Sequence, residues 1–136
     1  MRLNVYGEIV RDEWLRTSNV RTNVTLDEYV VMPNHFHGIL IITNDPCRGL
    51  ARQAPTVPQF AKPQPDSLGT IIGAFKSAVT RRINTHRTER NLPIVHVWQR
   101  NYYERIIRDE KELFNTRRYI IENPMNWAND ENHPNR

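Results

Sequence analysis

Apolar residues in the first third of the chain follow patterns that predict one helix and one β-hairpin. Near the N-terminus, the apolar side of a helix carries Ile9, Val10 and Trp14. Two β-rich runs follow at 28–32 and 35–43, and the Pro33-Asn34 pair between them predicts a hairpin. The second run is apolar on both faces at its far end, which predicts a central strand.

The second half of the chain has the pattern of two helices with two strands between them. Ser67 is a suitable N-cap for a long helix with an apolar stripe formed by Leu68, Ile71, Ile72, Phe75, Val79 and Ile83. Runs at 94–98 and 104–107 predict two further strands. Asp109 and Glu112 form a capping-box pattern for a last helix, which Pro124 ends near Asn123. This order predicts an α+β fold, a mostly antiparallel sheet covered by helices.

The chain has 136 residues and a mass of 16.1 kDa, which fits a single domain over 1–136. Five of the nine prolines lie within 44–66, a stretch without periodic pattern. This stretch is longer than most connections inside compact domains, so it predicts a Pro-rich loop over the surface. Too little chain follows it to form a second core.

The sequence lacks the usual features of secreted and membrane proteins. The longest apolar run, Ile39–Ile42, is far shorter than the ~18 residues of a membrane-spanning helix. The first residues do not form the apolar stretch of a signal peptide. Cys47, the one cysteine, cannot form an internal disulfide or a Cys-rich zinc site. We therefore expect a cytoplasmic protein.

The net charge of +4 is concentrated in the middle of the chain. Residues 46–105 carry 10 basic and 3 acidic side chains, a balance of +7, whereas 1–45 and 106–136 have balances of −2 and −1. Most of these basic residues are arginines, whose planar guanidinium binds phosphate oxygens bidentately. The distribution favours nucleic acid as a partner, with a well-solvated surface as the alternative.

His35 and His37 are the first candidates for chemistry. Strand side chains two positions apart project from the same face, so both imidazoles point one way and Phe36 points the other. Two neutral imidazoles placed in this way can chelate a divalent metal. A His-x-His sequence also occurs by chance, so the motif alone leaves metal binding open.

Tyr119 and Asn123 lie one turn apart on the last predicted helix and are neighbours along one side. In a helical projection, the side expected to pack on the core carries Leu113, Phe114, Ile120 and Ile121. A phenol and an amide then share a face that packing does not require. An ordinary surface tyrosine and a helix-ending asparagine would give the same pattern.

Aromatic residues and arginines are interleaved over 98–105. This arrangement suits base stacking combined with phosphate contacts. Packing of hairpin aromatics on a helix explains Trp98 and Tyr103 equally well.

Four short motifs occur in order along the chain: Val31-Met32-Pro33-Asn34-His35-Phe36-His37-Gly38, then residues 72–77, 97–103 and 119–124. Together they resemble the IS200-like, single-tyrosine HUH transposases, whose signature is a histidine, a bulky apolar residue and a second histidine. The last motif, Tyr-Ile-Ile-Glu-Asn-Pro, is most similar to the REP-associated tyrosine transposase branch. The resemblance extends from near Leu3 to Trp127.

This resemblance implies a ferredoxin-like HUH core and an enzyme that nicks and rejoins single-stranded DNA. His35, His37 and Asn123 would hold a divalent metal, Mg²⁺ or Mn²⁺, that polarises the scissile phosphate. Tyr119 would attack phosphorus, giving a 5′-phosphotyrosine and a free 3′-hydroxyl. The branch recognises short imperfect DNA hairpins, whose backbone we expect to contact Lys76, Arg81, Arg82, Arg100 and Arg105.

The sequence departs from this family in one respect that affects the sheet. Members usually have a strand before the first helix, whereas this chain starts at that helix; without that strand the sheet exposes an edge. Two other functions stay open. One is a truncated, non-catalytic remnant that binds hairpin DNA or RNA, and the other is a metal-dependent phosphodiesterase that uses water. The sequence is compatible with a monomer and with a homodimer.

Overall fold

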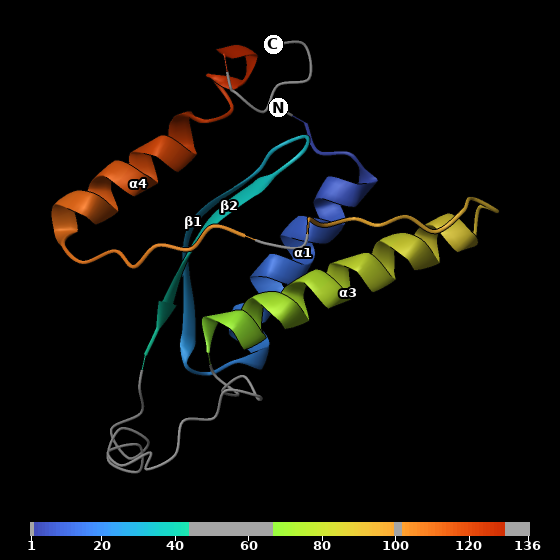
Figure 1. Ribbon diagram of the computed structural model, residues 1–136, viewed down its shortest axis with the longest axis horizontal. Helices are drawn as coiled ribbons and strands as arrows, with labels where there is room; N and C mark the ends of the chain where they lie inside the picture. The colour runs from blue at the N-terminus through green and yellow to red at the C-terminus, as the bar shows by residue number, and fades with distance from the viewer. Residues whose placement is uncertain (1, 44–66, 100–101, 130–136) are drawn as a thin grey trace.

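A computed structural model describes residues 2–43, 67–99 and 102–129 of the chain (Figure 1). Its elements, in chain order, are α1 (Val5–Val20), β1 (Val24–Val31), β2 (Phe36–Ile42), α3 (Leu68–Thr88), α4 (Glu110–Glu122) and the 3-10 helix η1 (Trp127–Asn129). β1 and β2 pair in an antiparallel, two-stranded sheet. The fold is α+β, as predicted.

Helices α3 and α4 begin at the predicted caps. The Ser67 hydroxyl accepts a hydrogen bond from the Thr70 amide at 3.2 Å. The Asp109 carboxylate accepts one from the Glu112 amide at 2.7 Å, and the Glu112 carboxylate in turn accepts from the Arg108 amide at 3.1 Å. These side chains satisfy amides that have no partner within the first helical turn.

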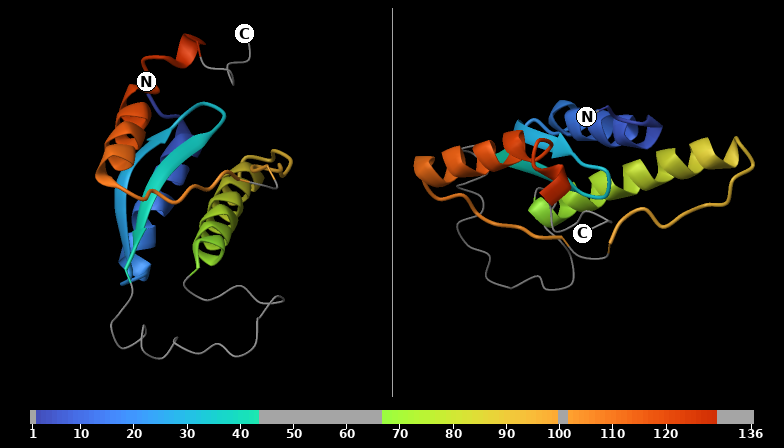
Figure 2. Two further views of the ribbon diagram at one scale, coloured as in Figure 1. Left: turned by 60° about the vertical axis from the view of Figure 1, so that its left-hand side comes forward. Right: turned by 90° about the horizontal axis from the view of Figure 1, so that it is seen from above.

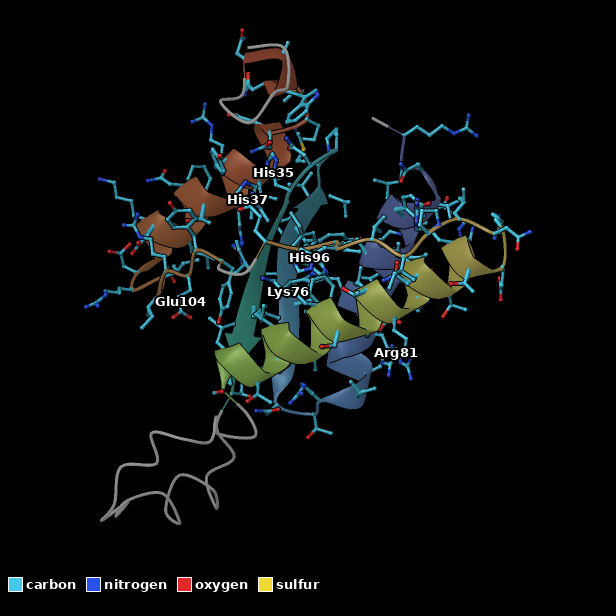
Figure 3. The ribbon with its side chains drawn as sticks, turned by 45° about the vertical axis from the view of Figure 1, so that its right-hand side comes forward. His35, His37, Lys76, Arg81, His96 and Glu104 are labelled. Carbon is cyan, nitrogen blue, oxygen red and sulfur yellow. The ribbon has the colours of Figure 1, made fainter. Side chains whose placement is uncertain are left out.

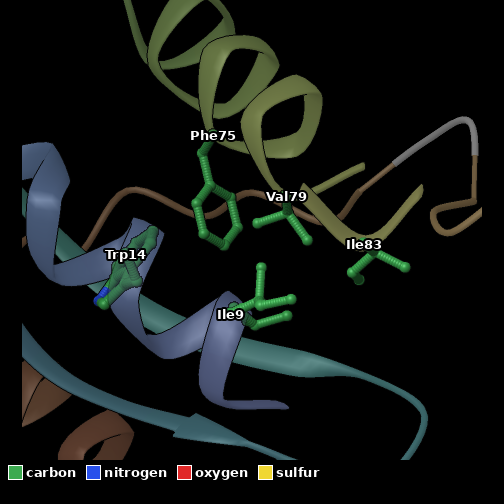
Figure 4. Close-up of a cluster of buried hydrophobic side chains, with 6 residues drawn as sticks. Ile9, Trp14, Phe75, Val79 and Ile83 are labelled. Carbon is green, nitrogen blue, oxygen red and sulfur yellow. The ribbon is translucent and has the colours of Figure 1, made fainter. Parts of the chain in front are cut away.

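Helices cover both faces of the hairpin, with α1 and α3 on one side and α4 on the other (Figure 2). The core on the α1–α3 side confirms the predicted apolar stripes and comprises Ile9, Val10, Trp14, Phe75, Val79 and Ile83 (Figure 4). Phe36 of β2 joins this core, with its ring centroid 4.8 Å from that of Trp14 and 5.5 Å from that of Phe75. Gly38 lets β2 approach closely, because a Cβ at this position would lie 2.5 Å from the Trp14 ring.

A β-bulge interrupts β1 between Leu26 and Tyr29. Leu26 pairs with Leu40 and Tyr29 with Gly38, so β1 has one more residue than β2 in this interval. Leu26 and Tyr29 both pack against the core, although strict alternation would place them on opposite faces. The extra residue therefore keeps both ends of β1 in contact with the core.

The prediction of strands at 94–98 and 104–107 is wrong, because the described residues of 91–108 contain no strand. Side chains of α3 satisfy the backbone of the first segment. The Asn84 amide donates to the Val95 carbonyl at 3.1 Å, and its oxygen accepts from the Val95 amide at 2.9 Å. Arg87 also donates to the Pro93 carbonyl at 2.7 Å. This segment consequently runs along α3 without pairing in a sheet.

The prediction that the second strand is central is also wrong for the described residues, in which β2 pairs with β1 alone. The ends of its apolar run, Ile41 and Ile42, are exposed. The predicted Pro-rich loop at 44–66, with Cys47, lies outside the described residues, as does Arg100. Within the described residues, no helix is long and apolar enough to cross a membrane.

Candidate active site

His35 and His37 flank the first residue of β2 and face away from the apolar core. Phe36 between them packs on Trp14, so strand alternation directs the two histidines toward the opposite face. Their ring centroids are 4.9 Å apart, and the Nε2 atoms of both rings are buried. Figure 3 shows the two side chains next to each other beside α4. The predicted pairing of the imidazoles is confirmed.

Helix α4 brings Tyr119 to this pair. The Tyr119 ring lies edge-on to His37, with centroids 5.4 Å apart and an interplanar angle of 76°. The tyrosine side chain is more than half exposed, at 55% of its accessible area. A phenol that contacts a histidine and is still open to solvent can meet a substrate.

The prediction that Asn123 lies on a face not needed for packing is wrong, because Asn123 is 4% exposed. The predicted core positions Phe114 and Ile121 are instead exposed, whereas Ile120 is buried. The face of α4 that contacts the sheet thus carries Leu113, Thr116, Arg117, Ile120 and Asn123. The helix is therefore rotated from the expected orientation, and Arg117, on the face toward the sheet, makes a polar interaction with the hairpin.

That interaction is a bidentate ion pair between Arg117 and Asp27 in the β1 bulge. Arg117 Nε lies 2.8 Å from Asp27 Oδ1, and Arg117 Nη2 lies 2.6 Å from Oδ2. The hydrogen bonds from Arg117 lower the pKa of Asp27 below its ordinary value, and the same contact raises the pKa of Arg117. This charged pair thus joins α4 to the hairpin.

Two more residues contact His35, and the sequence did not single them out for this role. Asn34 Oδ1 lies 2.8 Å from His35 Nδ1, which orients the ring and leaves Nε2 directed elsewhere. Trp127 of η1 packs on His35, with ring centroids 5.9 Å apart. The contact of Asn34 could have been predicted, because Asn34 is next to His35 in the sequence. No local pattern connects Trp127 with the hairpin, so its contact could not be predicted.

His35, His37 and Asn123 carry donor atoms of the kinds that a divalent cation accepts. Asn123 lies in sequence between Tyr119, which contacts His37, and Trp127, which contacts His35. Its Oδ1 is buried and accepts no hydrogen bond from a described residue, which is costly for a carbonyl oxygen. Two imidazole nitrogens and an amide oxygen are ligands that manganese accepts. In residues 2–43, 67–99 and 102–129, no group of three His, Cys, Asp or Glu side chains is placed to bind a metal, so a site here needs a ligand such as Asn123.

Lys76, an expected DNA contact, lies against aromatic rings. Its Nζ is 5.8 Å from the Trp98 ring centroid and 5.2 Å from that of Tyr102, and it donates to the Gln99 carbonyl at 3.3 Å. Trp98 Nε1 donates to the Lys76 carbonyl at 3.2 Å. Burial of the phenol and the charge of Glu104 raise the pKa of Tyr102. These contacts join the aromatic segment to α3, which fits the packing alternative for Trp98.

Two of the other predicted DNA contacts, Arg82 and Arg105, form ion pairs with acidic side chains. Arg82 forms ion pairs with Glu13 at 3.1 Å and with Asp12 at 3.9 Å, across the contact of α1 with α3. Arg105 pairs with Glu112 at 2.6 Å. Arg81 is exposed and lies on the side of α3 away from His35 and His37 (Figure 3).

Comparison with known proteins gives one informative match. A protein of Haemophilus influenzae, described as an uncharacterized protein, is 38% identical over 136 residues, which cover 96% of this chain and 71% of that protein. The chain belongs to the family of this protein. The description of the Haemophilus influenzae relative names no activity. No protein-family model and no solved structure matches the chain.

Proposed function

We propose that this chain is an IS200-like, REP-associated tyrosine transposase that nicks and rejoins single-stranded hairpin DNA through Tyr119. The proposal assigns the hairpin and its three covering helices to a ferredoxin-like HUH core. The observation that supports it most is the contact of Tyr119 with His37, two residues 82 positions apart in the sequence. This contact places a potential nucleophile beside a potential metal-binding pair.

In the proposed reaction, the Tyr119 phenolate oxygen attacks the phosphorus of a DNA phosphodiester. The bond from Tyr119 Oη to phosphorus forms, the bond from phosphorus to the 3′-oxygen breaks, and that oxygen takes up a proton. The phenol proton leaves to solvent, which the exposure of Tyr119 allows. The products are a 5′-phosphotyrosine and a free 3′-hydroxyl, and attack by a 3′-hydroxyl reverses the step.

His35, His37 and Asn123 would hold a divalent metal, Mn²⁺ or Mg²⁺. When bound, this ion supplies Lewis-acid polarisation of the scissile phosphate. Asn34 orients the His35 ring, and Trp127 covers one side of it. The carboxylate of Asp27 is neutralised by Arg117, which limits repulsion of the DNA backbone near α4.

The decisive experiment incubates the chain with labelled, hairpin-flanked single-stranded DNA and Mn²⁺ and separates covalent adducts on a denaturing gel. We expect an adduct with the native chain and none with Tyr119→Phe. Tyr103→Phe is the matched control, because Tyr103 is fully exposed on a different segment and should leave adduct formation unchanged. Equal cleavage by Tyr119→Phe, or no tyrosine-linked product from the native chain, contradicts the proposal.

The same gel separates the two alternatives. A non-catalytic remnant would bind the hairpin in a mobility-shift assay and form no adduct with either metal. A water-using phosphodiesterase would cleave DNA with Tyr119→Phe and lose cleavage with His35→Ala.

A further inference from the structure

The Asp27–Arg117 pair occupies the bulge of β1, where the regular hydrogen bonding of the hairpin is interrupted. Asp27 Oδ1 accepts from the Glu28 amide at 2.7 Å as well as from Arg117 Nε, and Oδ2 accepts from Arg117 Nη2. The Asp27 carboxylate therefore satisfies a backbone amide within the bulge and binds the guanidinium of another element. The Asp27 side chain is 12% exposed and the Arg117 side chain 43%, so the carboxylate is the better shielded member of the pair.

The pair restricts how α4 can lie on the hairpin. A bidentate contact fixes the orientation of the guanidinium as well as its distance from the carboxylate. Ile120, one turn further along α4, is buried, so the helix has a second point of contact on the same face. Two contacts one turn apart determine both the rotation of α4 and its position along the hairpin.

Rotation and position of α4 decide where Tyr119 and Asn123 lie. Tyr119 follows Arg117 by two residues, and Asn123 follows it by six. One residue of helix corresponds to a rotation of about 100° and a rise of about 1.5 Å, so a small displacement would separate Tyr119 from His37. Among the apolar residues of α4, Ile120 is buried and resists such a displacement, whereas Phe114 and Ile121 face solvent and do not.

We propose that the Asp27–Arg117 pair is a positioning device that sets the register of α4 on the hairpin, so that Tyr119 and Asn123 face His35 and His37. Neither residue of the pair touches the reacting atoms, so each acts through α4. An effect of the pair on catalysis rests on the proposed function. Its effect on the position of α4 does not depend on that function.

The register can be measured without metal or DNA. Because the Tyr119 ring is edge-on to His37, it changes the chemical shifts of the His37 ring protons, and Tyr119→Leu gives the reference value without this effect. We would record these shifts in the metal-free chain for Asp27→Asn and Arg117→Lys. Asp27→Asn keeps the acceptor for the Glu28 amide and removes the charge, and Arg117→Lys keeps the charge and removes the planar fork.

We expect both variants to move the His37 shifts toward the Tyr119→Leu value. The matched control is Arg118→Gln, which removes the exposed Arg118–Glu122 pair on the same helix and should leave the His37 shifts unchanged. The indole signal of Trp14 reports the core on the opposite face and should stay native in all variants. Native His37 shifts in both variants, or loss of the Trp14 signal together with the His37 effect, would overturn the proposal.

The adduct assay provides a second, separate readout. If Tyr119 is the nucleophile, misplacement by about 1 Å should lower the maximal rate of adduct formation by about 100-fold in Arg117→Lys, with KM for DNA little changed. If the native chain forms no adduct, the proposed function fails, and the His37 shifts still decide whether the pair sets the register. A rise in KM with an unchanged maximal rate would contradict the positioning role.

Discussion

The two faces of the hairpin are held by different kinds of interaction. On the α1–α3 face, aromatic and aliphatic side chains exclude water, and Trp14 and Val79 are 1% and 0% exposed. On the α4 face, buried Ile120 is accompanied by polar groups, namely an ion pair, two histidines and a buried asparagine amide. One strand serves both, because Phe36 points into the core and the histidines on either side of it point toward α4.

This difference indicates that the α1–α3 face contributes mainly to the stability of the fold and the α4 face mainly to the proposed site. Apolar burial stabilises the fold without direction, whereas hydrogen bonds and ion pairs fix orientation at a smaller net gain in stability. On the α4 side, Tyr119 is more than half exposed, and Phe114 and Ile121 on the outer side of the helix remain in solvent. We therefore expect substitutions on the α1–α3 face to alter mainly the free energy of unfolding and those on the α4 face to alter mainly the site.

The largest expected loss of stability comes from Trp14→Ala. Removing the indole leaves a cavity between α1, β2 and α3, which should reduce the free energy of unfolding by about 3–5 kcal/mol. Urea denaturation followed by circular dichroism measures this change. Phe114→Ala is the control on the exposed side of α4 and should alter stability by less than about 0.5 kcal/mol. Similar losses in free energy of unfolding in both variants would contradict the proposed difference between the two faces.

Metal binding should stabilise the α4 face. If His35, His37 and Asn123 bind Mn²⁺, an ion concentration 100 times the dissociation constant adds about 2.7 kcal/mol to the free energy of unfolding. Thermal denaturation with and without a chelator measures the effect. Asn123→Ala should reduce it, and Asn126→Ala, on an exposed neighbour, should not. Equal stabilisation of both variants would exclude Asn123 as a ligand.

Gly38→Ala tests the close approach of β2 to Trp14. The added Cβ would lie 2.5 Å and 2.9 Å from two ring carbons of Trp14, so the strand or the ring must move, at a cost of about 1–3 kcal/mol. Gly73→Ala is a suitable comparison, since no atom lies within 4 Å of a Cβ at that helical position. A Gly38→Ala chain as stable as the native one would contradict the close packing of this face.

The smallest effect is the pH dependence of the Asp27–Arg117 pair. The pKa of Asp27 is lower in the folded chain than its ordinary value of about 3.9, so the pair stabilises the fold above that value and this stabilisation is lost as the pH falls through the lower, folded pKa. The difference in free energy of unfolding between the native chain and Asp27→Asn should therefore shrink on acidification from about pH 6 to about pH 3. A difference that stays constant over this range would show that Asp27 gains no stabilisation from its charge.

Local patterns predicted the helices, the hairpin and the pairing of His35 with His37. Caps, apolar stripes and strand alternation are determined by neighbours within a few residues, and Ser67 and Asp109 behave accordingly. The extended course of 93–99 could not be predicted in this way. Its apolar run has the composition of a strand, but Asn84 and Arg87 of α3 satisfy its backbone.

The orientation of α4 shows where the sequence alone was insufficient. Its apolar residues predict a packing face that includes Phe114 and Ile121, and the structure buries Ile120 and Asn123 on the side of Arg117. The partner of Arg117 is Asp27, 90 residues earlier and in a bulge that no local pattern indicates. The sequence by itself determined which segments are helical or extended, because those preferences are local. Only the tertiary structure decided which side of α4 faces the histidines, because the residues that α4 contacts, Asp27 among them, lie far from it in the sequence.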